Sequence, residues 1–145
     1  MSLYHVGNSR GQEQAAYMRR LDAAGVCIFC PEHLAADPDQ DIVHRTPHWT
    51  VTPNRFPYVD TLLHLMLVPD EHVTDLLDLS PAAQLDFWAV LGWVREHHRL
   101  TYYSLGARNG DCRHTGGTIA HVHVHVIVGD PDGAGVRFKM SATSR

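Results

Sequence analysis

The alternation of polar and hydrophobic positions is most regular in "HVHVHVIV", which runs from His121 to Val128. Histidine occupies every second position at its start, and β-branched residues fill the intervening and following positions. Successive side chains of a strand point to opposite faces, and β-branched residues favour strands. The pattern therefore predicts a strand within "TIAHVHVHVIVG" that presents three imidazoles on one face, roughly 6 to 7 Å between neighbours, with the valines packed on the other.

Two helices are predicted upstream of this strand. Residues 11–24, "GQEQAAYMRRLDAA", have helical composition and end at Gly25, a residue suited to a helix C-cap. Ser80 followed by Pro81 is an N-cap with proline at the first helical position, and it opens a long amphipathic helix that runs to about Leu100. We expect the stripe of this helix that faces the core to consist of Leu85, Trp88, Ala89, Leu91, Gly92 and Val94.

Short strands are predicted near residues 41–46, 48–53 and 62–68 and within "TYYSLGARN", and Pro69 ends the third of them. The segments "VCIFCPEHLAADPDQD" and "GDCRHTGG" are predicted to be loops, the first of which opens with a tight turn. The order of these elements favours an α+β fold, in which an antiparallel sheet of about five strands packs with one long helix and a short N-terminal helix.

A chain of 145 residues has the size of one domain, and we expect a single domain over 1–145 whose ends, 1–10 and 130–145, are flexible or peripheral. No apolar run approaches the roughly 18 residues that span a bilayer, and "MSLYHVGNSRGQEQ" lacks a signal-peptide pattern, so we expect a soluble, cytoplasmic protein without a membrane partner. The net charge of −4 offers no basic surface to long nucleic acid. A single nucleotide is compatible with this charge, because backbone amides and histidines can hold a small phosphate.

The histidine row indicates a binding site. Burying three titratable rings without partners costs on the order of several kcal/mol, so a metal, an anion or another polar group should lie against them. The alternative is an exposed strand with solvated histidines, which does not explain the strict alternation with valine. Just upstream, Gly116 and Gly117 let backbone amides approach a ligand and Thr118 adds a hydroxyl, which favours an anion cradle over an ordinary hairpin loop.

The middle histidine of the row is the natural nucleophile. An imidazole that attacks phosphorus needs one free nitrogen, with the other nitrogen held as N–H by an acceptor. His123 has a histidine on either side, and its attack would give a covalent phosphoramidate. His125 would then lie closer to the leaving oxygen, where a donated hydrogen bond stabilises the departing charge.

Cys27 and Cys30 form a CxxC pair. Two thiolates at this spacing can bind one tetrahedral zinc together with two further ligands. A pair of packed thiols and a redox pair are the alternatives, and Cys112 is interpreted as incidental. The candidates by type for the further ligands are His33, His44, His48, His72 and one histidine of the row.

The row "HVHVHVIV" resembles the signature of the histidine triad (HIT) superfamily of nucleotide hydrolases and transferases. In order along the chain, "CIFC", "NRFPYV" and "HLMLVPDEHV" resemble landmarks of bacterial, zinc-bearing HIT proteins, and "NRFPY" also resembles the dinucleoside polyphosphate phosphorylase branch. The resemblance covers residues 27–128. It implies a HIT-like fold and a homodimer formed through the long helix and its adjoining strand.

The resemblance also implies roles for the triad. His123 matches the nucleophile, and His125 matches the histidine that contacts the phosphate and the leaving group. His121 matches the histidine that orients the middle ring or, in zinc-bearing relatives, binds the metal with the CxxC cysteines and a histidine equivalent to His72. A Zn²⁺ bound by Cys27, Cys30, His72 and His121 would be structural, because all four positions are filled and none is left for water.

Eight residues are expected to bind substrate: Asn54, Phe56, Pro57, His64, Asn109, Gly116, Gly117 and Thr118. By resemblance, Asn54 holds the ribose hydroxyls, Phe56 and Pro57 line the base pocket, and His64 lies on the strand behind the triad. Asn109 and Thr118 resemble polar residues on the phosphate side.

The chain departs from the family pattern at three places. About two additional residues separate Asn54 from His64, and Gly117 stands where many relatives have glutamine, in a loop lengthened by "DCRHT". The C-terminal "VRFKMSATSR" has no counterpart of the tryptophan found in some branches. These departures fall on the leaving-group side, so they bear on the second half of the substrate rather than on the attack.

The expected reaction is cleavage at the α-phosphate of a nucleoside phosphoramidate, an aminoacyl adenylate or a dinucleoside polyphosphate through a nucleotidyl-His123 intermediate. The alternatives are a dinucleoside polyphosphate phosphorylase-like enzyme, a non-catalytic nucleotide sensor and a hydrolytic metalloenzyme. The last would use the triad as zinc ligands around a bound water, but alternating positions on one flat strand converge poorly on one ion.

Overall fold

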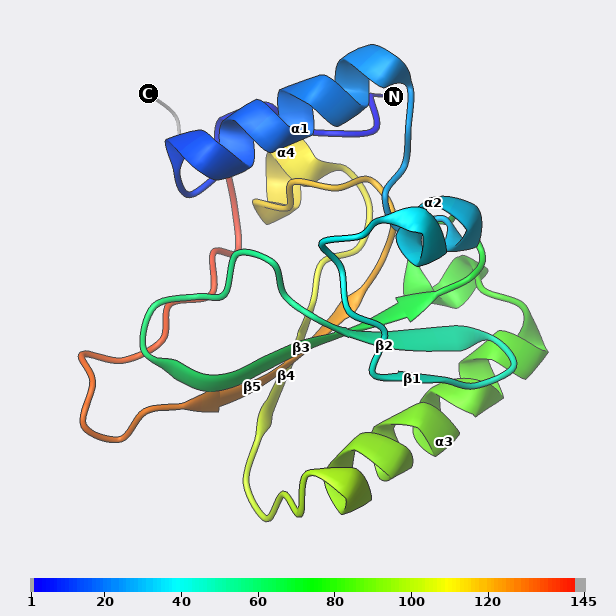
Figure 1. Cartoon of the computed structure of the whole chain (residues 1–145), viewed down its shortest axis with the longest axis vertical. Coiled ribbons are helices and arrows are strands. Elements are labelled where there is room, and N and C mark those ends of the chain that lie inside the picture. Colours follow the sequence, from blue (N-terminus) through cyan, green and yellow to red (C-terminus); the bar gives the residue numbers. More distant parts are fainter. Residues whose placement is uncertain (1, 143–145) are drawn as a thin grey trace.

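A five-stranded antiparallel sheet organises the protein, as seen in a computed structural model that describes residues 2–142 (Figure 1). The strand order is β1-β2-β3-β5-β4, so β3 lies at the centre between β2 and β5. This arrangement confirms the predicted α+β fold. The strands are β1 (His44–Arg45), β2 (Trp49–Pro53), β3 (Thr61–Pro69), β4 (Ser104–Ala107) and β5 (Val124–Gly129).

The helices include both predicted ones. The N-terminal helix ends at Gly25, which adopts the left-handed conformation with φ of 69°, and Ser80 Oγ caps the long helix by accepting a hydrogen bond from the Ala83 amide. Two further short helices lie in the segments predicted to be loops. The helices are α1 (Gln12–Ala24), α2 (Pro31–Ala36), α3 (Pro81–His97) and α4 (Cys112–Thr115), with 3-10 turns η1 (Val6–Asn8) and η2 (Leu76–Asp78).

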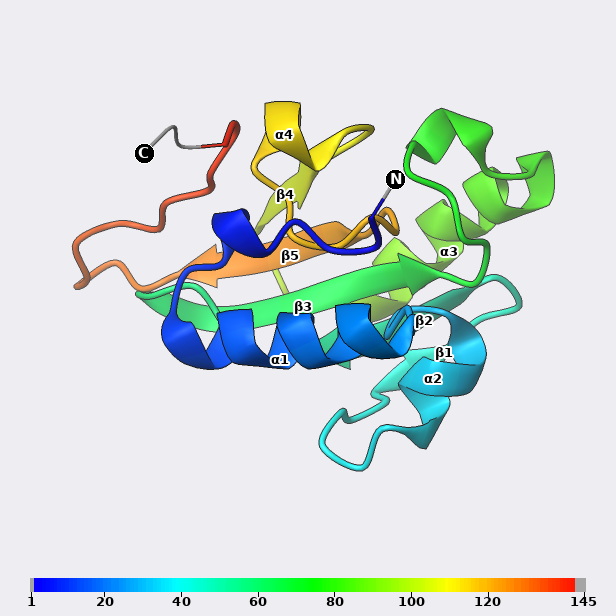
Figure 2. The same ribbon diagram turned by 90° about the horizontal axis from the view of Figure 1, so that it is seen from above.

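Helices α1 and α3 cover opposite faces of the sheet (Figures 1 and 2). On the α3 face, Val124 and Val126 of β5 join a core that includes Val90 and Val94. On the α1 face, Met66 of β3 packs in a second cluster with residues of α1 and of the CxxC turn. Because strand residues alternate between faces, His125 lies on the α1 side of the sheet, opposite its valine neighbours.

The predicted histidine strand is shorter than expected, because β5 begins only at Val124. The preceding segment bonds elsewhere: Ala120 N donates to Leu3 O at 2.8 Å, and Val122 N donates to Val73 O at 2.8 Å. The prediction that all three imidazoles share one face of a strand is therefore wrong. These backbone contacts join residues far apart in sequence, which the local alternation does not report.

The predicted core-facing stripe of α3 is wrong for three of its six residues, whereas Leu91 and Val94 are buried as expected. Leu85 and Trp88 are 75% and 68% exposed, and Ala89 is exposed as well. Apolar residues occur on both sides of this helix, so its sequence contains two competing stripes. The stripe that packs on the sheet contains Ala83, Val90, Leu91 and Val94.

Residues near both ends of the chain pack against the rest of the fold. Tyr4 and Asn8 are buried, and Asn8 Nδ2 donates to the carbonyl oxygens of Cys112 and Gly117 at 3.0 and 2.7 Å. The segment after β5 turns back toward α4 (Figure 2), and Phe138 of this segment packs on the site described below. Within residues 2–142, no helix has the length and apolar character needed to cross a bilayer.

Candidate active site and metal centre

Four side chains from three distant segments converge on one point. Cys27 and Cys30 come from the turn before α2, His72 follows β3, and His121 precedes β5. Their ligand atoms all lie within 4.8 Å of one another. The Nδ1 atom of His121 lies 3.5 Å from Cys27 Sγ and 3.1 Å from His72 Nδ1, and Cys30 Sγ lies 3.4 Å from His72 Nδ1.

The three short separations are close to those of a tetrahedral zinc site, and Cys30 Sγ lies 3.9 Å from His121 Nδ1. Zn–S bonds of about 2.3 Å and Zn–N bonds of about 2.0 Å place neighbouring ligand atoms roughly 3.3 to 3.8 Å apart. His121 Nε2 lies 2.8 Å from Pro69 O, so the ring donates N–H there and keeps the lone pair of Nδ1 toward the cysteines. Both cysteines are free thiols. The donor set and its geometry therefore suit a closed, four-coordinate site.

His123 has a defined tautomer. Its Nδ1 atom lies 2.8 Å from the backbone oxygen of His121, which can only accept, so Nδ1 carries the hydrogen and Nε2 keeps its lone pair. Burial lowers the pKa of His123 to about 4, which keeps the ring neutral near pH 7. The ring contacts the edges of Phe29 and His125, both with centroids 4.9 Å away.

A second chain of hydrogen bonds orients His125. The backbone N–H of Tyr58 donates to His64 Nδ1 at 3.1 Å, so the hydrogen of the neutral His64 ring is on Nε2. That atom lies 2.7 Å from His125 Nδ1, which must accept, and the hydrogen of His125 is therefore on Nε2. Within the described residues, this buried Nε2 has no hydrogen-bond partner. His125 thus offers a free N–H beside His123.

The charge state of this pair follows from its surroundings. Burial, reinforced by the positive charge of Arg10, lowers the pKa of His64 to about 4. Burial, reinforced by the neighbouring His123 and His64, lowers the pKa of His125 well below its ordinary value. Both rings are therefore neutral at physiological pH, as the tautomer assignment requires.

Asn54 lies next to this histidine pair. Its Oδ1 accepts a hydrogen bond from the Phe56 amide at 2.8 Å, which fixes the orientation of the side chain. Its Nδ2 lies 3.2 Å from His64 Nε2, but both atoms carry hydrogens in this arrangement, so no hydrogen bond joins them. The amide hydrogens of Asn54 are thus available to a ligand.

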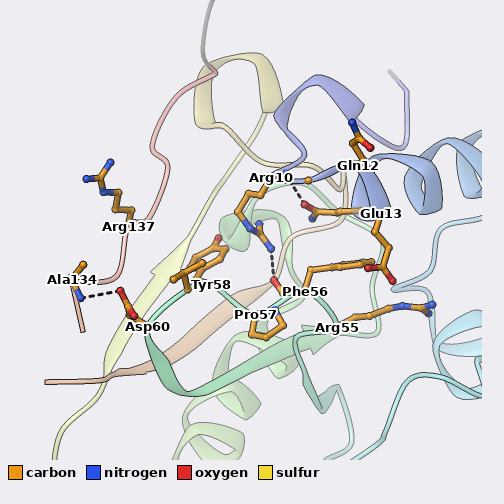
Figure 3. A pocket seen from close by; sticks show the side chains of 14 residues that line it. Arg10, Gln12, Glu13, Arg55, Phe56, Pro57, Tyr58, Asp60, Ala134 and Arg137 are labelled. Carbon is orange, nitrogen blue, oxygen red and sulfur yellow. Dashed lines mark hydrogen bonds between the residues drawn. The ribbon is translucent and has the colours of Figure 1, made fainter. Parts of the chain in front are cut away.

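Two adjoining cavities surround these groups. A narrow one is lined by His123, His125, Asn54 and Thr118 together with apolar residues that include Phe29. A wider one, of about 710 Å³, is shown in Figure 3. Phe56 and Tyr58 line both, whereas Pro57 lines only the wider one.

The wider cavity is rich in arginine. Figure 3 shows Arg137 and Arg55 toward opposite ends, with Arg10 between them above the ring of Tyr58. Arg10 lies 4.3 Å from the centroid of that ring and donates to Phe56 O. Arg55 is paired with Asp37 at 3.6 Å, whereas Arg10 and Arg137 have no ion pair within residues 2–142.

The remaining predicted residues lie at different distances from the site. Gly117 lies on a small cavity shared with His121 and His123. Asn109 lines neither large cavity, and its Oδ1 accepts from the Leu76 amide at 2.8 Å. Gly116, with φ of 79°, ends α4 and packs against Lys139 rather than lining either cavity.

Sequence reasoning missed three residues around His125. Tyr58 stacks on the His125 ring with centroids 5.5 Å apart, Phe138 meets its edge at 5.5 Å, and Arg108 lines the same cavity. Tyr58 belongs to the "NRFPYV" motif, and its place in that motif is the one feature of the sequence that could have identified it as a site residue. Nothing local marked Arg108, and Phe138 reaches the site only because the chain after β5 folds back.

Comparisons of the sequence with known proteins point to one family. The HIT domain family matches residues 36–132. The nitrilase and fragile histidine triad fusion protein NitFhit of Caenorhabditis elegans is 31% identical over 94 residues, which cover 62% of this chain and 20% of that protein. The chain therefore corresponds to about a fifth of that relative's length.

Solved structures share the fold. A histidine triad nucleotide-binding protein from Candida albicans superposes with a TM-score of 0.62 at 22% identity, covering 81% of this chain and 86% of that one. A HIT family hydrolase from Clostridium thermocellum gives a TM-score of 0.59 at 20% identity, covering 75% and 95%. With the family match extending over most of the chain and the histidine triad within it, this protein belongs to the HIT domain family.

Proposed function

We propose that this protein is a nucleotide hydrolase or transferase that cleaves at the α-phosphate of a nucleoside phosphate derivative through a nucleotidyl-His123 intermediate. One observation carries the proposal: His123 Nδ1–H is bound to the His121 carbonyl, which leaves the Nε2 lone pair free in a cavity that also holds the unpaired N–H of His125. A nucleophile and a donor for the leaving atom are therefore neighbours.

In the first step the Nε2 lone pair of His123 forms a bond to the α-phosphorus, and the bond from phosphorus to the leaving atom breaks with its electron pair. The His125 N–H donates a hydrogen bond to that atom. The imidazole becomes cationic, and its Nδ1–H bond to the His121 carbonyl stabilises that charge. Water or another acceptor then attacks phosphorus, and the breaking P–N bond returns its electron pair to His123.

The nucleoside half would occupy the narrow cavity. Asn54 has free amide hydrogens there for ribose hydroxyl groups, and Phe29 and Phe56 provide apolar surface for the base. The cavity is tight in this structure, and Tyr17 packs against Phe56 with ring centroids 5.9 Å apart. We therefore expect Phe56 to move when a base enters.

We also propose that the Cys27, Cys30, His72 and His121 cluster holds a structural Zn²⁺, as in the zinc-bearing subtype of the family. A bound zinc would tie the CxxC turn to His121, with no coordination position left for substrate. His121 presents the carbonyl that orients His123, so this chain's own backbone links the two sites. We propose a cytoplasmic location as well, because a CxxC pair that binds metal rather than forming a disulfide is typical of a reducing compartment.

A specific observation favours one of the three substrate classes. Arg10 and Arg137 line the wide cavity, which adjoins the narrow cavity that His125 lines. Neither arginine has an ion-pair partner in the part of the chain that is described. A leaving group with further phosphates and a second nucleoside would suit this volume and charge better than an amine or an amino acid. The second candidate function is accordingly a dinucleoside polyphosphate hydrolase or phosphorylase-like enzyme.

We further propose that two copies associate through α3 and β4. The exposed side of α3 carries Leu85 and Trp88, and Tyr102 and Leu105, in and just before β4, are exposed as well. Large exposed apolar patches of this kind mark protein interfaces. A second copy would cover them with an identical face, as a two-fold dimer requires.

Turnover by a His123→Ala variant tests the mechanism. We expect hydrolysis of nucleoside phosphoramidates and dinucleoside polyphosphates by the wild type, and a fall of roughly three or more powers of ten in the variant. His33→Ala, which changes a surface histidine, should behave as the wild type. Near-normal turnover by His123→Ala would exclude the covalent mechanism, and a wild type that binds nucleotides without turning them over would indicate a sensor.

A further inference from the structure

Arg108 follows β4 and reaches the cavity that His123 and His125 line. Its Nε atom donates to Lys139 O at 2.8 Å, and one terminal nitrogen donates to the Tyr58 hydroxyl at 3.0 Å. The guanidinium group also lies 3.9 Å from the centroid of Phe138. These contacts hold the group in one place beside the two histidines.

The guanidinium group retains most of its donors. It carries five N–H groups, of which the two named hydrogen bonds use two. No carboxylate forms an ion pair with Arg108 among residues 2–142. A positioned cation with spare, planar donors and no anionic partner is an arrangement suited to a phosphate.

The same two aromatic rings fix Arg108 and His125. Tyr58 stacks on His125 and accepts the Arg108 hydrogen bond, and Phe138 contacts both the guanidinium group and the edge of His125. The positive charge of Arg108 is also among the causes that lower the pKa of His125. The cation therefore lies beside the group that we expect to meet the leaving atom.

Gly117 lies against the stem of this side chain. A Cβ atom at Gly117 would lie 3.4 Å from Arg108 Cδ and 3.4 Å from Thr115 Oγ1, which is ordinary van der Waals contact. The stem of Arg108 is thus packed beside the loop that precedes the triad.

We propose that Arg108 is a catalytic residue of this chain that binds the non-bridging oxygens of the substrate's α-phosphate. In the ground state its charge offsets the phosphate charge that would repel the His123 lone pair. In the transition state it stabilises the charge on the equatorial oxygens. The catalytic part rests on the proposed function, whereas the binding part concerns any nucleoside monophosphate.

Calorimetry on the full chain tests the binding part without turnover. Each of the four nucleoside 5′-monophosphates and its parent nucleoside is titrated into the wild type, Arg108→Gln and Arg108→Lys. We expect Arg108→Gln to bind the preferred monophosphate about 10- to 100-fold more weakly and the nucleoside unchanged, because one charge-assisted contact is lost. Arg108→Lys keeps the positive charge but lacks the planar guanidinium group, so its affinity for the monophosphate should lie between those of the wild type and Arg108→Gln.

The control is Arg113→Gln, which removes an exposed arginine of α4 that is paired with Asp111 at 2.6 Å. It should bind both ligands as the wild type does. Thermal unfolding of each variant reports whether the tail, held by Arg108 through Lys139 O, has loosened.

Each outcome has one meaning. Equal weakening of monophosphate and nucleoside binding by Arg108→Gln and Arg108→Lys would identify Arg108 as a support for the C-terminal segment and overturn the assignment. Unchanged monophosphate binding in Arg108→Gln would overturn it as well, while leaving the proposed function intact. A wild type that binds none of the monophosphates would overturn both proposals.

Discussion

His64 Nε2 lies 2.7 Å from His125 Nδ1, and the direction of the hydrogen bond between them is fixed by a third group. Because the Tyr58 backbone N–H occupies His64 Nδ1, His64 must donate to His125. A main-chain amide on one loop thereby sets which nitrogen of a strand histidine carries the hydrogen. His64 is in this sense a positioning residue rather than a substrate contact.

Replacing His64 with leucine should therefore impair His125 without removing it. Without a donor at His125 Nδ1, the hydrogen is free to move to that atom, and the N–H toward the leaving group is lost. We expect kcat to fall about 10- to 100-fold, the range for one catalytic hydrogen bond, with KM changed much less. Steady-state kinetics measure kcat and KM separately, and ¹⁵N NMR of the His125 ring reports the tautomer directly.

The NMR reading separates positioning from packing. If His64→Leu keeps the wild-type ¹⁵N pattern of His125, the loss of activity would have to come from distorted packing, and the relay from Tyr58 would be wrong. His64→Gln, which restores a donor at a similar reach, should recover part of kcat.

The buried His64 also predicts a pH dependence of stability. Its pKa is about 4 in the folded state, lowered mainly by burial, against about 6.5 when unfolded. The unfolded chain therefore takes up the proton first. The stability that His64 contributes is full above about pH 6.5 and is lost as the pH falls from there toward 4.

Urea unfolding at pH 7.5 and pH 4.5 measures this contribution. The wild type should lose more free energy of unfolding between these two pH values than His64→Gln does, by on the order of 2 kcal/mol. An equal loss in both proteins would mean that His64 is not held neutral in the fold.

If the cluster binds zinc, substituting one of its four ligands should destabilise the protein, and substituting a cysteine outside it should leave the zinc bound. Cys30→Ser should reduce bound zinc, measured by elemental mass spectrometry, from about one ion per chain to much less, because a tetrahedral site loses one thiolate. The melting temperature should fall by roughly 5 °C or more, since the zinc-bound state no longer stabilises the fold. Cys112→Ser changes a buried thiol outside the cluster and should keep the zinc.

The exposed face of α3 predicts the oligomeric state. Trp88→Glu should turn the proposed dimer into a monomer in light scattering after gel filtration, because it places a charge in the centre of an apolar contact. Leu62→Glu alters an exposed leucine of β3, outside this face, and should remain dimeric. A monomeric wild type at micromolar concentration would refute the association.

Local signals account for much of the fold. Gly25 ends α1 and Ser80 begins α3 as their chemistry predicts, and the β-branched alternation locates β5 from Val124 onward. Each of these features depends on a few adjacent residues, so it can be recognised from the local sequence alone. The four zinc ligands that the family resemblance implied also come together.

The errors concern contacts between distant segments. His121 and His123 leave the strand pattern because residues 118–122 pair with the chain near Leu3 and Val73. The wrong stripe of α3 was chosen because Trp88 looks as apolar as Val90, and only the position of the sheet decides between them. Arg108 had no local marker, since its importance comes from Tyr58 and Phe138, which lie 50 and 30 residues away.

The proposed reaction depends on a covalent bond between the free nitrogen of His123 and phosphorus. Its most direct test is intact-protein mass spectrometry after a brief exposure to a nucleoside phosphoramidate or a dinucleoside polyphosphate and a rapid quench, followed by peptide mapping. We expect a mass increase of one nucleoside monophosphate on the peptide that contains His123, and no such increase in His123→Ala. Turnover by the wild type with no adduct at any quench time, or an adduct that persists in His123→Ala, would contradict it.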